Sequence, residues 1–313
     1  MFFNSEIKKT EYEQLMQVIK DLNEDKSKVY ADETYRLGLK VKRYLNFLTI
    51  NGIKGKLDRR KQFGHMKPMP DLPDAINDRK VCNYFLNDKI AVYTCITGGY
   101  DNIIEPLFVP NNCDFYAITD FELPQGSKWS RIDVDSFSEA LELNNVLKNR
   151  YFKFFPHKVF KDYKYSIYID GNIKVCSDLT EHVNRISDLG VSFFRHSKRN
   201  CVYVEADTCE QLKKEKPEHL RELIDFLKSE GFPRNYGLIE CNFIVRDHSS
   251  KLCAEIMEDW WKMFNRFAKR DQLSLPFVLY KRKIRVGELV TLGNNVHKEY
   301  SIEFVQHNKK KHL

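Results

Sequence analysis

The sequence lacks any apolar run long enough to cross a membrane. A transmembrane helix needs about 20 mostly apolar residues, and no stretch of the 313-residue chain approaches that length. The opening segment, MFFNSE at 1–6, also lacks the basic and apolar regions of a signal peptide. These two absences predict a cytoplasmic protein.

Several familiar binding signatures are missing as well. The chain contains neither a G-x-G-x-x-G sequence nor a Walker lysine motif, so neither a dinucleotide fingerprint nor a P-loop is supported. Its eight cysteines form no C-x-x-C or C-x-x-H pair, and four lie within apolar runs, where a reduced cysteine behaves as a small hydrophobic residue: Cys95, Cys201, Cys241 and Cys253. We therefore expect neither a zinc site nor a disulfide framework.

A strong charge imbalance is also absent. The net charge of +7 is modest for this length, and the basic residues gather in patches at 54–61, 281–285 and 309–311. Such patches suit an anionic lipid surface, a nucleotide or an acidic glycan. Nucleic acid is the competing partner, but no nucleic-acid-binding signature accompanies the charge, so we expect none to bind. We expect peripheral contact with the inner face of the plasma membrane, with a purely solubilising role as the alternative for 309–311.

Three regions of the chain differ in pattern. With 42% hydrophobic residues, the chain can bury one full-sized core and an appended element. We predict a helical N-terminal extension and connector over residues 1–88, an α/β domain over 89–300 and a basic tail over 301–313. The extension is predicted from two apolar stripes at helical spacing, which are Tyr12, Leu15, Ile19 and Leu22, and then Leu37, Val41, Tyr44, Leu45 and Leu48.

Two apolar runs in the α/β domain end in polar residues. The run at 89–96 (KIAVYTCI) leads into Thr97, Gly98, Gly99, Tyr100 and Asp101, and the run at 113–119 (CDFYAIT) leads into Asp120. Both runs have the composition of buried strands. Glycines after a strand let the backbone approach a ligand and offer amide donors to it. Because ligands of open α/β sheets bind beyond the carboxyl ends of the strands, these residues predict a nucleotide-binding crevice.

A third run, YSIYI at 165–169, delivers Asp170 and Asn172 to the same kind of position. Oxygen side chains spaced in this way can share a divalent cation or a ribose. The competing interpretation is an ordinary Asp-Gly-Asn turn, because all three residue types tolerate turn backbone angles.

The segment at 138–155 has apolar residues at roughly helical spacing. Its second half places Arg150 and Lys153 three apart on one helical face. Two cations on one face could bind a diphosphate, the arginine through two parallel hydrogen bonds and the lysine as a compact charge. A solvated basic face is the alternative.

Taken in order, these segments resemble a family first catalogued as a domain of unknown function and later described as glycosyltransferase-like, with plant and bacterial members. The resemblance covers about residues 89–295. The segments that carry it are Ile90–Asp101 (IAVYTCITGGYD), Asn149–His157 (NRYFKFFPH), Tyr165–Val175 (YSIYIDGNIKV), His196–Glu205 (HSKRNCVYVE) and Arg270–Gln272 (RDQ).

The resemblance implies a GT-A-like fold, which is a Rossmann-like mixed sheet flanked by helices, and a nucleotide-sugar donor. Asn172 departs from the commonest GT-A pattern, in which a second aspartate is usual. A neutral amide weakens a divalent site, so Mn²⁺ or Mg²⁺ on Asp170 and Asn172 is an expected but not a strictly required cofactor. The expected donor-binding residues are Thr97, Gly98, Gly99, Tyr100, Asp101, Asp120, Arg150, Lys153, Asp170 and Asn172.

A strand-like run at 238–245 (LIECNFIV) carries a carboxylate in its middle. Period-two alternation places Glu240 and Asn242 on one face and the apolar residues on the other, namely Ile239, Cys241, Phe243 and Val245. A carboxylate in an apolar strand is costly unless it is paired or used, and glycosyl transfer needs a carboxylate near the anomeric carbon. We predict Glu240 as the catalytic residue, with an edge strand that exposes Glu240 to water as the alternative.

Asp271 is the rival catalytic acid, because similar Asp-Gln pairs sit at the donor and acceptor junction in several GT-A families. Capping of the next helix is its alternative role. It follows an amphipathic helix predicted over 249–267, whose apolar side is Ile256, Trp260, Phe264 and Phe267. The predicted acceptor-binding residues are His196, Arg199, Glu205, Asn242, Trp261 and Gln272. A surface position is the alternative for His196, and core packing is the alternative for Trp261.

These expectations converge on a glycosyltransferase that moves a sugar from a nucleoside-diphosphate donor to a glycan or lipid-linked acceptor, in the assembly of a surface polysaccharide such as capsule or lipopolysaccharide. A non-catalytic nucleotide- or glycan-binding module with the same fold is the second hypothesis, and a basic nucleic-acid-binding protein is the third. A carboxylate at Glu240 or Asp271 that faces the same crevice as Asp170 separates the enzyme from the module.

Overall fold

The structure is a computed structural model that describes Gln17 and residues 88–306. The chain divides into two units, Met1–Pro73 and Asp74–Leu313, and the fold given below is that of the second unit. The N-terminal helices predicted within 12–48, the connector and the basic patches at 54–61 and 309–311 lie outside the described residues.

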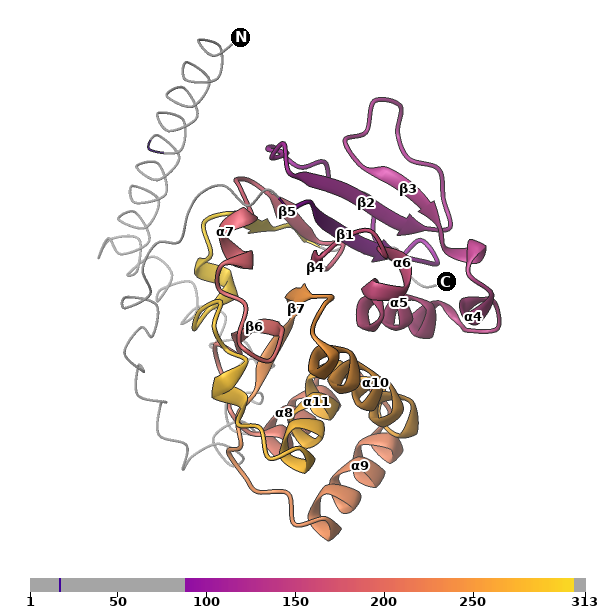
Figure 1. The fold of residues 1–313 in the computed structure, drawn as a ribbon. Helices are drawn as coiled ribbons and strands as arrows, with labels where there is room; N and C mark the ends of the chain where they lie inside the picture. Colours follow the sequence, from indigo (N-terminus) through magenta and orange to yellow (C-terminus); the bar gives the residue numbers. More distant parts are fainter. Residues whose placement is uncertain (1–16, 18–87, 307–313) are drawn as a thin grey trace, which may run out of the picture. The chain divides into compact units, whose positions relative to one another are not determined.

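A six-stranded mixed sheet forms the centre of the domain, with the order β3-β2-β1-β4-β7-β6 (Figure 1). Strand β7 runs antiparallel to both of its neighbours, and the other neighbouring strands run parallel. The predicted mixed α/β sheet flanked by helices is confirmed. The strands are β1 (Ile90–Ile96), β2 (Cys113–Thr119), β3 (Ser130–Asp133), β4 (Tyr165–Ile169), β6 (Val191–Arg195) and β7 (Ile239–Asp247).

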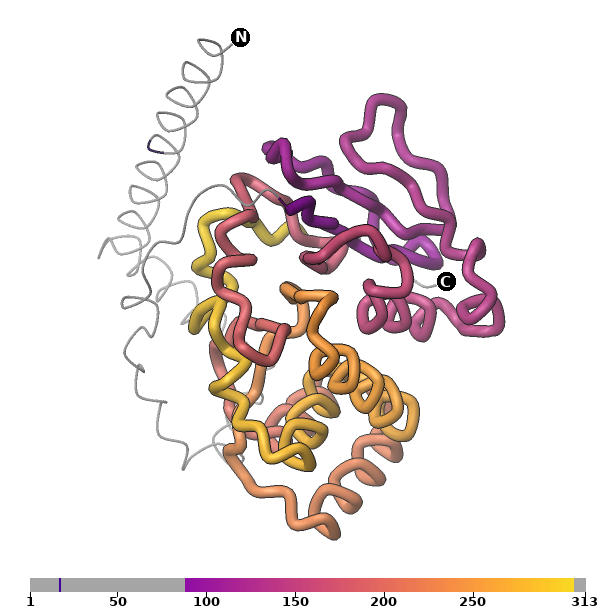
Figure 2. Tube along the Cα trace, viewed as in Figure 1, coloured from indigo at the N-terminus to yellow at the C-terminus, as the bar shows by residue number. Residues whose placement is uncertain are grey.

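A second, two-stranded sheet joins the middle of the domain to its C-terminal end. Strand β5 (Ile173–Val175) pairs antiparallel with β8 (Ile302–Phe304), so two segments far apart in the sequence lie side by side (Figure 2). The domain therefore extends beyond the predicted boundary at residue 300, and the first residues assigned to a basic tail form part of the fold.

Helices surround the sheet, and none that the structure describes is long and apolar enough to cross a bilayer. The apolar pattern predicted over 138–155 forms two helices, because the side chain of Asn144 accepts a hydrogen bond from the Leu147 amide and starts a new one. The α-helices are α4 (Ser138–Leu141), α5 (Asn145–Phe154), α6 (Pro156–Val159), α7 (Thr180–Val183), α8 (Val202–Gln211), α9 (Pro217–Ser229), α10 (Lys251–Arg266) and α11 (Asp271–Lys281). Three short 3-10 helices are η1 (Val134–Ser136), η2 (Val286–Glu288) and η3 (Val296–Lys298).

The sheet is covered on both faces, as the alternation along β1 shows. Val92 belongs to a hydrophobic cluster that includes Leu179 and Val183 at α7, whereas the next residue, Tyr93, donates a hydrogen bond to the Phe152 carbonyl of α5 at 3.1 Å. The sequence of a strand that is buried on both faces is a nearly continuous apolar run. This arrangement explains why the run at 89–96 contains no polar alternation.

Helix α10 fixes the position of α11. Three of its four predicted apolar residues, Ile256, Trp260 and Phe264, are fully buried, and the Trp260 ring stacks on Phe154 with the centroids 4.1 Å apart. The Trp260 indole donates a hydrogen bond to the carbonyl oxygen of Asp271 at 3.2 Å. The first turn of α11 is thereby held against the core, and this turn carries the Asp-Gln pair.

Candidate active site

The predicted site residues converge on one edge of the sheet. Because β7 runs antiparallel to β4 and β6, its first residues lie beside the carboxyl ends of those two strands. The carboxyl ends of β1 and β2 lie at the same edge, since they pair in parallel with each other and with β4. The glycine turn, Asp120, Asp170, His196 and Glu240 therefore share the edge at which open α/β sheets bind ligands.

The glycine turn after β1 binds the end of β2. Gly98 has φ of +66° and donates its amide to Asp120 Oδ2 at 2.7 Å. A Cβ atom at Gly98 would lie 2.3 Å from Asn145 Nδ2, so glycine is required by both backbone angle and space. The Thr97 hydroxyl anchors the turn by donating to the Asn145 carbonyl at 2.8 Å. Tyr100, which follows the two glycines, is 64% exposed.

Asp101 lies close to the Asp-Gly-Asn turn. A Cβ atom built on Gly171 would meet Ile96 at 2.9 Å and Asp101 Oδ2 at 3.5 Å. Asp101 itself is buried. The structure thus brings together the segments after β1 and β4, as the parallel pairing of these strands requires.

Four charged residues behind this edge form a compact ionic cluster, which consists of Arg150, Lys153, Asp170 and Asp271. Lys153 Nζ lies 2.6 Å from Asp271 Oδ2 and 3.4 Å from Asp170 Oδ1. Arg150 Nε lies 3.4 Å from the same Asp271 oxygen. Lys153 is only 1% exposed, whereas the Asp170 side chain is 35% exposed. The cluster is charge-balanced, and Asp170 is the member that reaches the surface most.

The cations of this cluster keep Asp271 ionised. Burial acts to raise the pKa of the Asp271 carboxyl, but Lys153, Arg150 and Arg270 outweigh burial and hold that pKa well below its usual range. A general base works best when its pKa lies near the operating pH. Asp271 is therefore better suited to hold Lys153 and Arg150 in place than to take a proton.

A second group lies at the start of β7, and we refer to it as the Glu240 cluster: His196, Arg199, Glu205, Glu240 and Gln272. Gln272 Nε2 donates to Glu240 Oε2 at 2.9 Å, and His196 Nε2 lies 3.9 Å from Glu240 Oε1. Glu240 is 8% exposed and its strand lies between β4 and β6. The alternative of an edge strand with Glu240 in water is wrong.

The environment of Glu240 brings the pKa of its carboxyl close to neutral pH. Burial raises the pKa of Glu240 to about 7, and the neighbouring Glu205 adds to the rise, while a backbone amide at Ser197, Arg199 and Gln272 act against it. Burial lowers the pKa of His196 to about 3, with help from Arg199, so its ring is neutral. Its Nδ1 accepts from the backbone amides of residues 198 and 199, and its Nε2 lies 3.3 Å from Arg199 Nη2 and 3.9 Å from Glu240 Oε1.

The alternation predicted for β7 does not hold throughout the strand. The pairing with β6 shifts register between Phe193 and Phe194. Phe243 lies in the hydrophobic core, whereas Cys241 lies beside the ionic cluster, where burial and the Asp271 charge raise the pKa of its thiol. The prediction that Cys241 and Phe243 share one face is wrong, because a β-bulge interrupts the alternation.

The backbone at Asn242 connects the two clusters. Its carbonyl oxygen accepts a hydrogen bond from the Asp170 amide at 2.9 Å, so the Asp-Gly-Asn turn is bonded directly to β7. Its side-chain oxygen Oδ1 is buried without a hydrogen-bond partner among the residues described.

Trp261 packs edge-on against Tyr151 and Phe155 at the contact between α5 and α10. These ring contacts favour the packing alternative for Trp261.

One residue of the ionic cluster's surroundings was missed by sequence reasoning. The Tyr168 hydroxyl donates to Asp170 Oδ1 at 2.8 Å, and Lys153 Nζ lies over the Tyr168 ring, 4.9 Å from its centroid. Tyr168 and Asp170 are two positions apart, so they share a face of the strand. This spacing of a hydroxyl and a carboxylate is the signal that could have identified Tyr168.

The residues predicted to hold a divalent cation provide a modest donor set. Asp170 offers one carboxylate, which Lys153 and Tyr168 already contact through Oδ1. Asn172 donates its amide nitrogen to the Val305 carbonyl at 3.4 Å, which leaves its side-chain oxygen as the group that could bind a metal. Magnesium is often held by one or two carboxylates together with substrate phosphates. The pair fits a divalent cation that shares its coordination with a donor diphosphate.

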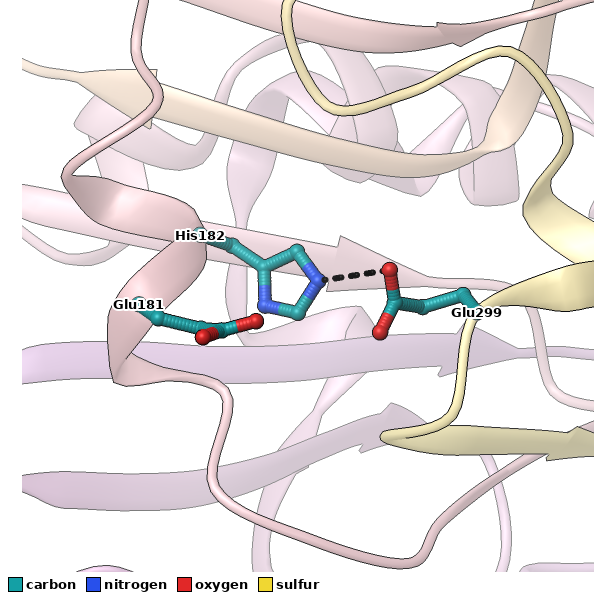
Figure 3. Close-up of side chains that lie close together, drawn as sticks. All are labelled: Glu181, His182 and Glu299. Carbon is teal, nitrogen blue, oxygen red and sulfur yellow. Dashed lines mark ion pairs between the residues drawn. The ribbon is translucent and has the colours of Figure 1, made fainter. Parts of the chain in front are cut away.

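Within the described part of the chain, one group of three His, Cys, Asp or Glu side chains lies close enough together to hold a metal ion. This group does not include Asp170 or Asn172. Glu181, His182 and Glu299 place ligand atoms within 4.8 Å of one another (Figure 3). His182 Nδ1 faces the Leu179 carbonyl at 3.2 Å, so that nitrogen carries a proton, and Nε2 lies 3.6 Å from Glu299 Oε2.

This group already contains its own counter-charges. Arg185 lies 2.8 Å from Glu181 and 3.9 Å from Glu299. Burial acts to raise the pKa of Glu299, but His182 outweighs burial and lowers that pKa to about 2. Arg185 and His182 thus already occupy the two carboxylates, and the set joins α7 to the C-terminal segment.

The family model for the TOD1/MUCI70 glycosyltransferase-like domain matches residues 137–307. This stretch is more than half of the chain and contains the ionic cluster and the Glu240 cluster. The chain belongs to this family. The family resemblance found in the sequence is thereby confirmed, and the mixed sheet flanked by helices that was predicted with it is present. The segments at Thr97–Asp101 and Asp120 precede the matched stretch.

Two solved structures that align with the chain carry glycosyltransferase names. The apo form of WbbM, a bifunctional glycosyltransferase, aligns with a TM-score of 0.42 and 11% identity over 68% of this chain and 40% of its own. The apo form of mouse xyloside xylosyltransferase 1 aligns with a TM-score of 0.36 and 11% identity over 64% of this chain and 83% of its own. Likeness at this level says nothing of substrate. No curated protein is similar enough in sequence to count as a match.

Proposed function

We propose that this protein is a glycosyltransferase that moves a sugar from a nucleoside-diphosphate donor to a glycan or lipid-linked acceptor in surface-polysaccharide assembly. The observation that carries the proposal is the juxtaposition of two unlike clusters at the ligand-binding edge of the sheet. One cluster holds the Asp271 carboxylate ionised beside two cations, and the other holds Glu240 near its protonation midpoint at neutral pH.

The ionic cluster is assigned to the donor. Asp170 is its most exposed member and follows β4, where a carboxylate can accept from a ribose hydroxyl. Arg150 has a side chain that is 19% exposed and is the cation better placed to bind a phosphate oxygen directly. Lys153 is buried between Asp170 and Asp271, so we expect it to act mainly by holding these carboxylates in position. A divalent cation on Asp170 and Asn172 would further neutralise the diphosphate.

The Glu240 cluster is assigned to the reacting centre. In the proposed step, an acceptor hydroxyl oxygen forms a bond to the anomeric carbon while the bond from that carbon to the diphosphate oxygen breaks. The hydroxyl proton passes to Glu240, and the bonding electron pair leaves with the nucleoside diphosphate. Gln272 orients the Glu240 carboxylate through its 2.9 Å hydrogen bond, and a pKa of about 7 suits a group that must accept and then release a proton.

The proposal is tested by incubating the protein with a panel of nucleotide sugars and measuring released nucleotide, with Mn²⁺, with Mg²⁺ and with chelator. We expect release from at least one donor, and we expect the Glu240→Gln variant to lose it. Glu303→Gln, which changes an exposed glutamate of β8, is the matched control. Nucleotide binding without release from any donor, and without transfer to any acceptor, would favour the non-catalytic binding module.

Peripheral attachment to an anionic membrane on the cytoplasmic side is a further part of the proposal, and it is based on the basic patches of the sequence. The patch at 281–285 is partly neutralised, because Arg282 binds Asp259 and Glu255 and Lys281 pairs with Glu230. Attachment would then depend on 54–61 and 309–311. Flotation with liposomes at low salt checks it, and binding that is independent of anionic lipid would contradict it.

A further inference from the structure

A small polar cavity is lined by residues that adjoin the Glu240 cluster in sequence. It has a volume of about 110 Å³ and lies between the end of β6, the loop before β7 and η2. Its lining includes Arg195, Asn200, Asn235, Tyr236, Leu238 and Gly287. A cavity of this size has room for several waters or for one compact charged group.

Arg195 is the charged residue of this lining, and its guanidinium has no partner within the described residues. Its Nε atom is fully buried and makes no hydrogen bond. Other half-buried arginines nearby are paired, as Arg199 is with Glu205 and Arg185 with Glu181. A partly desolvated cation without a counter-charge is unfavourable unless a ligand provides one.

The lining also supplies groups that could complete an anion site. Asn200 and Asn235 carry side-chain amides, which donate hydrogen bonds. The Tyr236 hydroxyl is already committed to the Ile284 carbonyl at 2.8 Å, so it shapes the wall. Gly237 has φ of +118°, and a Cβ atom there would lie 2.7 Å from Val286 Cβ, so the close approach of this wall to η2 requires glycine.

The position of the cavity points to the acceptor. Arg195 immediately precedes His196, and Leu238 lies two residues before Glu240, which is roughly 7 Å along a strand. The His196 amide bonds to the Leu238 carbonyl at 3.0 Å. The donor residue Asp170 follows β4, two strands away from β6, or roughly 10 Å at the usual strand spacing. A group bound beside Arg195 is therefore nearer to Glu240 than to the expected donor diphosphate.

We infer that the cavity around Arg195 binds an oxyanion, a carboxylate or a phosphate, carried by the acceptor, and thereby orients the acceptor hydroxyl toward Glu240. The link to Glu240 depends on the proposed function, whereas anion binding does not. The chemistry is shared by an acidic sugar and by the phosphate of a lipid-linked acceptor. Arg195 is a specificity residue in this assignment and takes no part in proton transfer.

The test measures binding of glucuronate, inorganic phosphate and glucose to the full chain by calorimetry at low salt. We expect glucuronate or phosphate to bind and glucose, which lacks the charge, to bind far more weakly. The tighter of the two anions identifies the source of the oxyanion. Arg195→Gln should weaken anion binding by roughly 10-fold to 100-fold, as the loss of a charge-assisted hydrogen bond does. Arg195→Lys should retain part of it.

Arg221→Gln is the matched control, because it removes the same charge from an exposed position on α9 and should leave binding unchanged. Arg195→Gln should also keep or raise the melting temperature, since it removes an unpaired cation.

The inference is overturned if neither anion binds, if Arg195→Gln binds as tightly as the wild type, or if that variant unfolds at a much lower temperature. Anion binding in a protein that never transfers sugar would refute the proposed function and leave the anion site standing. If the protein does transfer sugar, equal turnover of acidic and neutral acceptors by both wild type and Arg195→Gln would refute the acceptor role alone.

Discussion

Asp271 and Gln272 are neighbours in the chain, yet their side chains bond to different clusters. Asp271 Oδ2 lies 2.6 Å from Lys153 Nζ in the ionic cluster, and Gln272 Nε2 lies 2.9 Å from Glu240 Oε2 in the Glu240 cluster. Trp260 holds this turn of α11 through the Asp271 carbonyl. The two clusters are therefore positioned by a single helix start, which joins the donor side of the site to the side where we place the chemistry.

Removal of the Arg150 guanidinium should weaken nucleotide binding. Arg150→Ala is expected to cost about 1.5 to 3 kcal/mol of nucleoside-diphosphate binding, the usual value of a hydrogen bond to a charged group. Calorimetry with the preferred nucleotide measures the loss. Arg131→Ala, which removes a half-buried arginine of β3 that pairs with Asp133, is the control. Unchanged affinity in a folded Arg150→Ala variant would remove Arg150 from the site.

Removal of Lys153 should destabilise the fold. Lys153→Met leaves the buried Asp271 carboxylate without its nearest counter-charge, and breaking a buried ion pair typically costs about 3 to 5 kcal/mol of unfolding free energy. Urea unfolding measures this. The double variant Lys153→Met/Asp271→Leu should recover much of the loss. Lys281→Met, which breaks an exposed pair with Glu230, should cost less than about 1 kcal/mol; an equal cost for the two lysines would contradict the buried cluster.

Glu240 should make folding stability depend on pH. Its folded pKa of about 7 exceeds the ordinary value of 4.5, so the folded state holds a proton that the unfolded state releases between these values. Its contribution is fully present below about pH 4.5 and is lost as pH rises through about 7. Relative to Glu240→Gln, the wild type should lose about 3 kcal/mol of unfolding free energy over this window.

The comparison with Glu240→Gln removes the contributions of groups that titrate in both proteins, such as His248, whose pKa is lowered by burial to about 4. The charged and polar groups that face Glu240 are His196, Arg199, Glu205 and Gln272. Urea unfolding at pH 5, 6, 7 and 8 gives the two curves. A constant difference between them across this range would show that the carboxyl titrates at its ordinary pKa.

Glu299 should stabilise the fold without a metal. Glu299→Gln removes a buried carboxyl whose pKa is lowered from 4.5 to about 2 in the folded protein, so we expect a loss of about 3 kcal/mol of unfolding free energy at neutral pH. Because Arg185 and His182 already contact these carboxylates, neither chelator nor Zn²⁺ should change the melting temperature of the wild type. A rise with Zn²⁺ that disappears in Glu299→Gln would instead identify a metal site.

The strands were predictable because their composition is local. Apolar runs bounded by turn residues placed β1, β2 and β4 within one residue of their observed bounds at Ile90–Ile96, Cys113–Thr119 and Tyr165–Ile169. The candidate site residues at the ends of these strands follow from the parallel pairing of the sheet. The amphipathic helix predicted over 249–267 is α10, Lys251–Arg266.

Features that depend on distant residues were not predictable. Lys153 and Asp271 are 118 positions apart, and their pairing leaves no local pattern, so the sequence predicted Lys153 either as a phosphate-binding cation or as part of a solvated basic face. The β-bulge opposite Phe193 and Phe194 and the pairing of β8 with β5 likewise arise from tertiary packing, which overrides the period of the sequence.

The most direct test of the two-cluster division compares donor affinity and turnover in Asp170→Ala and Glu240→Gln. We expect Asp170→Ala to lower donor affinity by about tenfold or more, and Glu240→Gln to leave donor affinity within about twofold of wild type while lowering turnover by about 10²-fold or more. Near-normal turnover of Glu240→Gln, together with a loss of turnover in Asp271→Asn, would contradict the division and move the catalytic role to Asp271.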